Sequence, residues 1–325
     1  MKKFFVNIIV CLIFCSSCFA MGTVPEPVTT EVSVPFVTFV RTLGSSGSGS
    51  GQFLYPRDVS IGSYISASSG TSNIFVSDTG NNRVQVFNND GQFLFQFGGW
   101  GNSDGKFSSP SGITVVMGQN IYVADRDNNR VQKFDSIGTF LGEFGYFGMD
   151  MGKFTGPMGI AVDPMGKIFV ADSGNNRIEK FDESGTFLDS LGGFGMSNGY
   201  FNVPSDVAVD SNGFIYVADT KNDRVQKMNS NGMPLAVFGR AGSGDGEFHS
   251  PSGIAVDDRY IYVSDTGNNR VQIFNKNGKF LEKFGGTGIN NGEFSSPTGI
   301  SVGSLGRLLI ADTNNHRIQE FKVSF

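Results

Sequence analysis

Short apolar runs alternate with polar turns along most of the chain. Each of six β-type runs, such as Ile121–Val123 and Ile261–Val263, is followed by one residue and then an aspartate. An arginine follows each aspartate after four residues, and Val or Ile comes next. The pairs are Asp78 and Arg83, Asp125 and Arg130, Asp172 and Arg177, Asp219 and Arg224, Asp265 and Arg270, and Asp312 and Arg317. Successive aspartates are 46 or 47 residues apart, so the chain contains six copies of one repeat.

One copy is predicted to form four short strands. In the fifth copy these are Pro251–Val256, Tyr260–Ser264, Arg270–Phe274 and Lys279–Phe284. A Gly- and Asn-rich turn separates the second strand from the third, and Asn277-Gly278 is a hairpin signal before the fourth. Four strands per repeat of this length are typical of a propeller blade. We therefore expect an all-β, six-bladed β-propeller of four-stranded antiparallel blades.

The two ends of the chain predict how the ring closes. The sixth copy ends at Phe325, soon after its third strand, and lacks a fourth. Near the N-terminus, Phe36–Gly44 is similar to the fourth strands that end in Phe-Gly. We expect this N-terminal strand to complete the last blade, which removes an open sheet edge. The predicted propeller domain therefore spans residues 36–325.

The repeat resembles the NHL family, which is named after an Asn-His-Leu motif. The sixth copy reads Asn314-Asn315-His316-Arg317, and the other copies carry Asn-Asn-Arg or Asn-Asp-Arg at this point. The resemblance covers residues 36–325 and implies the fold. It does not imply one activity, because a propeller scaffold hosts many functions. Function must therefore be argued from the residues that differ between copies.

Residues 1–20 are predicted to be a signal peptide. Lys2 and Lys3 precede the apolar run Phe4–Phe14, and small residues stand before Ala20. We expect the protein to be secreted, periplasmic or at the cell surface, with no transmembrane segment in the mature chain. All three cysteines lie in this segment, and Cys18 stands in a context similar to a lipobox, so lipid anchoring at Cys18 is the alternative. Residues 21–35 are expected to be a short linker.

Charge and composition exclude several classes of protein. The 325 residues include 30 acidic and 25 basic ones, with no basic stripe, so nucleic-acid binding is not expected. The mature chain would have no cysteine for a disulfide, a thiolate metal site or a nucleophile. The Asp–Arg pair is not expected to be catalytic, because an active site occurs once and the pair occurs six times. We expect the aspartate to hold a turn and the arginine to bond between blades.

The connections between blades contain the strongest candidate binding residues. One aligned position reads Ser46, Trp100, Phe147, Phe194, Ala241 and Thr287, so three adjacent blades carry an aromatic residue there. Clustered apolar side chains on one face are typical of an interaction site. The alternative is that they fold inward between blades. The candidate binding residues are Trp100, Tyr146, Phe147, Met149, Phe194 and Met196.

Two acidic residues replace a repeated glycine at the start of the first strand. Asp58 and Asp206 stand in copies one and four, where the other copies carry Gly112, Gly159, Gly253 and Gly299. Calcium-dependent lactonases share a six-bladed ring and bind their cation with channel-mouth carboxylates. The two aspartates are therefore candidate ligands for calcium in the channel, or else surface substitutions.

These observations leave two functions open. The first is an extracytoplasmic binding or scaffold module that holds a protein, peptide or glycan on one face of the propeller. The second is a lactonase- or lyase-like enzyme with a metal ion at the central channel. Zinc held by histidines, as in the peptide-amidating lyase of the family, is not expected, because His249 and His316 are the two histidines and three ligands are usual. Ubiquitin-ligase association in animal relatives involves a separate Cys-rich segment that this chain does not contain. No catalytic residue is assigned.

Overall fold

The computed structural model describes residues 34–63, 72–116 and 120–324. The predicted signal peptide 1–20, nearly all of the predicted linker 21–35 and most of the Ser-rich loop between Gly62 and Asn73 lie outside these residues. Within the described part, no helix is long and apolar enough to cross a membrane.

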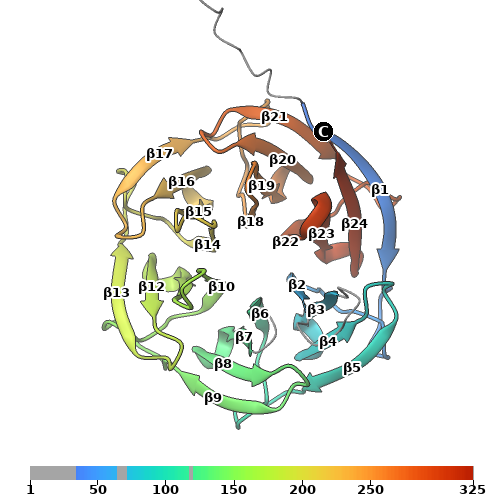
Figure 1. Ribbon diagram of the computed structural model, residues 1–325, viewed down its shortest axis with the longest axis vertical. Helices are drawn as coiled ribbons and strands as arrows, with labels where there is room; N and C mark the ends of the chain where they lie inside the picture. The colour runs from blue at the N-terminus through green and yellow to red at the C-terminus, as the bar shows by residue number, and fades with distance from the viewer. Residues whose placement is uncertain (1–33, 64–71, 117–119, 325) are drawn as a thin grey trace, which may run out of the picture. The chain divides into compact units, whose positions relative to one another are not determined.

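Six four-stranded antiparallel sheets are arranged in a ring (Figure 1), as the repeat predicted. Blade one consists of β2 (Asp58–Ser63), β3 (Ser72–Asp78), β4 (Arg83–Phe87) and β5 (Phe93–Gly98). Blade two consists of β6 (Pro110–Val116), β7 (Asn120–Asp125), β8 (Arg130–Asp135) and β9 (Phe140–Phe144). Blade three consists of β10 (Pro157–Val162), β11 (Ile168–Asp172), β12 (Arg177–Phe181) and β13 (Phe187–Gly192). Blade four is β14 (Pro204–Val209), β15 (Ile215–Asp219), β16 (Arg224–Met228) and β17 (Pro234–Phe238); blade five is β18 (Gly253–Val256), β19 (Tyr260–Asp265), β20 (Arg270–Asn275) and β21 (Phe280–Gly285); blade six is β22 (Pro297–Val302), β23 (Arg307–Asp312), β24 (Arg317–Ser324) and β1 (Phe36–Leu43).

The first strand of each blade lies nearest the ring centre, and the fourth lies at the outer rim (Figure 1). A short 3-10 turn links the second and third strands of every blade, as in η5 (Thr266–Asn268) and its counterparts η1 (Thr79–Asn81), η2 (Arg126–Asn128), η3 (Ser173–Asn175), η4 (Thr220–Asn222) and η7 (Thr313–Asn315). A further one, η6 (Ser304–Gly306), links the first two strands of blade six.

The hydrophobic core lies between neighbouring blades. The second strands are buried along most or all of their length, as in Ile215–Asp219, because sheets cover both of their faces. Side chains from two blades share each apolar cluster: Phe169 and Ile178 of blade three pack with Val207 and Ile215 of blade four. Removing apolar surface from water in this way is the main stabilising contribution to such a fold.

A repeated phenylalanine fills each seam between blades. Phe294 is fully buried, and its ring centroid lies 5.8 Å from that of Phe321 and 6.2 Å from that of Phe284. The ring needs a glycine beside it: a Cβ on Gly285, whose φ is +102°, would lie 2.5 Å from the Phe294 ring. The same position in the other blades holds the equally buried Phe53, Phe107, Phe154, Phe201 and Phe248.

The N-terminal strand closes the ring, as predicted. β1 runs antiparallel to β24, with Phe36 opposite Ser324 and Leu43 opposite Ile318. It therefore supplies the fourth strand of blade six, which the C-terminal part of the chain lacks. At the centre, the Gly299 N–H donates a 2.8 Å hydrogen bond to the Arg57 carbonyl and joins blade six to blade one.

Candidate binding face and channel mouth

The repeated aspartate is a buried hub of hydrogen bonds. In blade five, Asp265 accepts from the Asn268 side chain at 2.9 Å, Arg270 Nε at 2.7 Å and Gln272 Nε2 at 3.1 Å. Its other oxygen accepts the backbone N–H of His249 at 2.7 Å. All six aspartates are fully buried and lie 2.6–2.9 Å from their arginines. A buried charge is tolerated when it is paired and hydrogen-bonded in this way.

The repeated arginine fixes the connection that precedes its blade. Arg270 donates to the carbonyls of Ser243, Gly244 and Glu247 at 2.7–2.9 Å. The contacts of this motif are therefore directed at a turn on one side and at backbone on the other. Each of these contacts holds the backbone in place, which is a structural role.

The residue after each 3-10 turn fixes the following connection. Asn269 adopts a left-handed conformation, and its side-chain oxygen accepts the Ser296 N–H at 2.7 Å. In blade six His316 takes this place, and its Nδ1 accepts the Tyr55 N–H at 3.0 Å. Each turn thus holds the connections on both of its sides, and His316 continues the pattern across the closure of the ring.

The predicted binding residues project from these connections into solvent. The exposed fraction is 80% for Trp100, 70% for Phe147 and 73% for Phe194. Tyr146, Met149 and Met196 are exposed as well, so the alternative that these side chains fold inward does not occur. We call Trp100, Tyr146, Phe147, Met149, Phe194 and Met196 the apolar cluster.

The backbone beneath the apolar cluster is held in place. Trp100, Phe147 and Phe194 each form a single parallel bridge to the buried phenylalanine of the same connection. The carbonyls of Met149 and Met196 accept hydrogen bonds from repeat arginines, at 2.9 Å and 2.7 Å. The exposed side chains therefore stand on loops whose main chain is hydrogen-bonded.

Sequence reasoning missed several exposed apolar residues on the connections between blades. They are Tyr55, Met151, Tyr200 and Ile289. Ile289 occupies the repeat position of Met149 and Met196, so comparing that position across all six copies would have found it. The others stand at positions where the remaining copies carry unlike residues.

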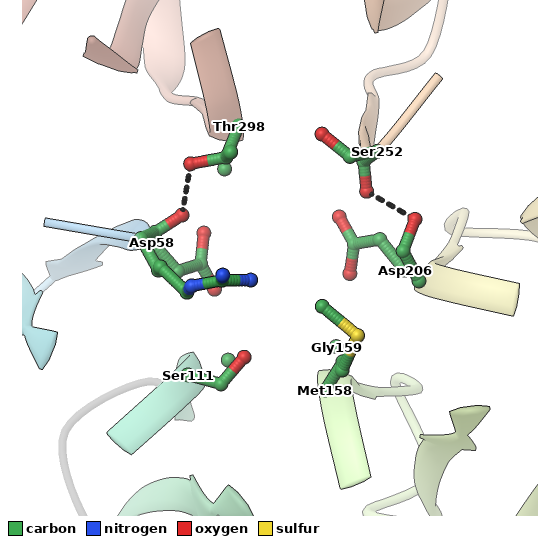
Figure 2. Close-up of a pocket in the computed structure, with 11 residues that line it drawn as sticks. Asp58, Ser111, Met158, Gly159, Asp206, Ser252 and Thr298 are labelled. Atoms are coloured by element: carbon green, nitrogen blue, oxygen red, sulfur yellow. Dashed lines mark hydrogen bonds between the residues drawn. The ribbon is translucent and has the colours of Figure 1, made fainter. Parts of the chain in front are cut away.

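The structure brings Asp58 and Asp206 to the mouth of the central channel rather than to the outer surface. Figure 2 shows the two carboxylates facing each other across a small cavity, with Ser111, Ser252 and Thr298 on its rim. The Thr298 hydroxyl donates to the Arg57 carbonyl at 2.7 Å. The chain segments that begin the first strands of all six blades meet here and together form this mouth.

Each of these aspartates joins its blade to the next. Asp58 accepts the N–H of Val59 at 2.8 Å and that of Ile113, in blade two, also at 2.8 Å. Asp206 accepts the N–H of Val207 and that of Ile254, in blade five, both at 2.9 Å. Both carboxyls thus already have one backbone donor on each oxygen.

Burial changes the acidity of both groups. It raises the pKa of Asp58 to about 7, although the N–H donors of Ile113 and Val59 oppose the rise. Burial, together with the nearby charge of Asp58, raises the pKa of Asp206 well above its usual range. The pair therefore carries less than two full negative charges at neutral pH. Among the described residues, no group of three or more His, Cys, Asp or Glu side chains is placed to hold a metal ion.

The ring of six four-stranded sheets defines the molecule as a six-bladed β-propeller. The family model for the NHL repeat matches residues 107–134, 154–181, 201–228, 248–274 and 294–321. The chain therefore belongs to the NHL-repeat family. Each matched segment begins at a buried phenylalanine and ends within a third strand or at its last residue.

Known proteins with similar sequence or structure differ in what they do. Protein brain tumor of Drosophila melanogaster is 36% identical over 73 residues, which are 22% of this chain and 6% of that protein. An auxiliary nutrient binding protein from Bacteroides ovatus has a TM-score of 0.62 at 13% identity, over 90% of this chain and 77% of the other. A gluconolactonase from Xanthomonas campestris has a TM-score of 0.61 at 14% identity, over 85% and 88% of the two chains. At these identities the two structures support the fold alone.

Proposed function

We propose that the protein is an extracytoplasmic binding or scaffold module that holds a protein, peptide or glycan on the apolar cluster. The exposure of these six side chains on hydrogen-bonded loops carries the proposal. Exposed aromatic and Met side chains are typical of interaction sites. A fixed backbone lowers the entropy that must be lost on binding. An auxiliary nutrient binding protein has a similar propeller, so the fold is compatible with a binding role.

The test is affinity capture from the envelope and secreted fractions of the native host. The bait is residues 21–325, compared with a Trp100→Ala/Phe147→Ala/Phe194→Ala variant that keeps the wild-type melting temperature. We expect a partner that wild type retains and this variant loses, because aromatic residues contribute most to such interfaces.

The matched control removes equally exposed apolar side chains from the turns at the opposite ends of the blades. It is Ile137→Ala/Met165→Ala/Leu305→Ala, which should capture the same partner as wild type. If all three baits capture the same proteins, or none captures any, the apolar cluster is not the binding surface.

The extracytoplasmic part of the proposal depends on the predicted signal peptide 1–20. Secretion of the full chain with cleavage after Ala20, measured by N-terminal sequencing, would support it. Labelled palmitate that is incorporated by wild type and lost in Cys18→Ala would instead establish a lipid anchor at Cys18. Incorporation that survives this substitution rules out an anchor at that residue.

A cation-dependent enzyme of the lactonase or lyase type is the second candidate. The facing carboxylates of Asp58 and Asp206 favour it, because hard cations such as calcium prefer oxygen ligands. Two carboxylates are few for such a site, and serine and threonine hydroxyls lie beside them. Stoichiometric calcium in the purified protein, lost in Asp58→Ala, would favour the enzyme. Metal-free protein that still captures its partner would favour the binding module.

A further inference from the structure

Blade three departs from the repeat at a buried position under the apolar cluster. The other five blades carry a glutamine there, and blade three carries Glu179; the glutamines are Gln85, Gln132, Gln226, Gln272 and Gln319. All six side chains are fully buried. This replacement exchanges a group that donates hydrogen bonds for one that donates only when it is protonated.

The glutamine in blade four shows what the position requires. Gln226 Nε2 donates to the Tyr200 carbonyl at 2.7 Å and to the Asp219 carboxylate at 3.0 Å. Its Oε1 accepts the Gly199 N–H at 2.9 Å. The amide thus bridges the preceding connection and the repeat aspartate, and it needs two donated hydrogen bonds to do so.

Glu179 stands in the same place without these bonds. Among the described residues, neither of its carboxyl oxygens has a hydrogen-bond partner. Arg177 Nη2 lies 2.7 Å from Oε1, but this nitrogen donates to the carbonyls of Asp150 and Lys153 at 2.7 Å and 2.9 Å. A glutamine at position 179 would donate one hydrogen bond to the Lys153 carbonyl and one to Asp172, as Gln226 does to the matching groups of blade four. Both of these groups are acceptors, so an ionised carboxyl would face them unfavourably.

Charged groups on the neighbouring strands act on Glu179. Asp172 lies on β11, Arg177 on β12 and Asp189 on β13, while Asp150 and Lys153 of the connection pair with each other. Burial is the main cause that raises the pKa of Glu179, to about 7. The charges of Asp172 and Asp189 add to the rise. The Arg177 guanidinium and the Gly152 N–H oppose it, although Gly152 does not reach hydrogen-bond geometry.

We propose that Glu179 is protonated in the folded protein and that loss of this proton releases the connection formed by residues 146–156. A protonated carboxyl has the shape of the glutamine amide and donates its O–H to the Lys153 carbonyl or to Asp172. An ionised carboxyl instead competes for the hydrogens of Arg177 Nη2, which already lies 2.7 Å away, and this weakens the bonds of that nitrogen to the carbonyls of Asp150 and Lys153. The connection that displays Tyr146, Phe147 and Met149 then loses its support.

The proposal gives a direction for the pH dependence. The pKa of Glu179 is higher in the folded protein than in the unfolded chain. The stability that its proton contributes is therefore complete below about pH 4.5 and is lost as the pH rises through about 7. The effect on the connection stands by itself, whereas any effect on ligand binding also rests on the proposed function.

The test compares wild type with Glu179→Gln, which installs the residue of the other five blades. Between pH 6 and 8.5, the melting temperature of wild type should fall by roughly 2–4 °C more than that of the variant. Gln226→Glu provides the reverse change and should gain a pH dependence of the same sign. Hydrogen exchange should show residues 146–156 losing protection above pH 7 in wild type, while residues 193–203 of the next connection keep theirs.

Two results would overturn the proposal. One is an equal pH dependence in wild type and Glu179→Gln. The other would be seen in wild type alone. If NMR of the protein labelled with carbon-13 glutamate shows no glutamate carboxyl signal that titrates near pH 7, the proposal fails. These readouts require no partner, so they can succeed if capture on the apolar cluster fails. If capture succeeds and Glu179→Gln changes nothing, the proposal for Glu179 fails and the binding function remains.

Discussion

At the scale of single residues, one arginine side chain in each blade holds a whole connection. Arg270 pairs with the fully buried Asp265 and donates to three backbone carbonyls. We expect Arg270→Ala to lower the free energy of unfolding by about 3–5 kcal/mol, because it leaves a buried carboxylate and several carbonyls without partners. The midpoint of urea denaturation measures this loss.

An exposed cation in the same blade provides the control for this prediction. Lys279 lies in the hairpin before β21, and Lys279→Ala should leave the urea midpoint within error of wild type. If Arg270→Ala behaves like Lys279→Ala, the repeat pair does not support the fold, and its role in the six blades must be sought elsewhere.

At the scale of elements, β1 decides whether the ring is closed. Leu43 is 5% exposed and packs with Phe53 and Ile318, while Val40 is 50% exposed at a bulge on the same strand. We expect Leu43→Asp to abolish folding or to lower the melting temperature by 10 °C or more, roughly the effect of several kcal/mol, because it buries an unpaired charge. Val40→Asp should melt close to wild type. Thermal unfolding followed by circular dichroism distinguishes the two, and equal melting temperatures would show that β1 does not close the ring.

The boundaries of the strands could be predicted closely because the sequence contains six copies of one pattern. The second strand of blade five was expected at Tyr260–Ser264 and runs to Asp265, while the first was expected from Pro251 and begins at Gly253. Repetition also placed Asp58 and Asp206 in opposite blades. It could not show that each accepts an N–H from the next blade, since that contact joins residues about 50 positions apart.

The direction of side chains on the connections was harder to predict. An apolar residue such as Trp100 fits either a buried seam or an exposed face, and periodicity does not distinguish them in an irregular loop. The seam is already filled by Phe107, so Trp100 has no buried space left and points to solvent. The environment of Glu179 was equally hard to predict. The sequence shows only an ordinary exchange of Gln for Glu, whereas the structure shows that the carboxyl oxygens have no hydrogen-bond donors.

At the scale of the whole molecule, the six inner strands approach one another backbone to backbone around the axis. A Cβ on Gly299 would lie 2.1 Å from an Asp58 carboxyl oxygen, 2.5 Å from the Asp58 Cα and 2.7 Å from the Arg57 carbonyl oxygen. We expect Gly299→Ala to cost about 1–3 kcal/mol of stability or more, because the ring must open to admit one methyl group. Urea denaturation measures this cost. Gly142→Ala on the outer strand β9 is the control, since a Cβ there meets nothing within 4 Å.

A second substitution shows which atoms set the spacing around the axis. Asp58→Gly removes the nearest carboxyl oxygen but leaves the main-chain atoms of Arg57 and of residue 58 in place. We therefore expect Asp58→Gly/Gly299→Ala to remain destabilised relative to Asp58→Gly alone. Full recovery in the double variant would contradict this, and it would mean that the carboxylate of Asp58, rather than the backbone, sets the distance between blades six and one. The channel mouth would then be a site whose width depends on its two acidic side chains.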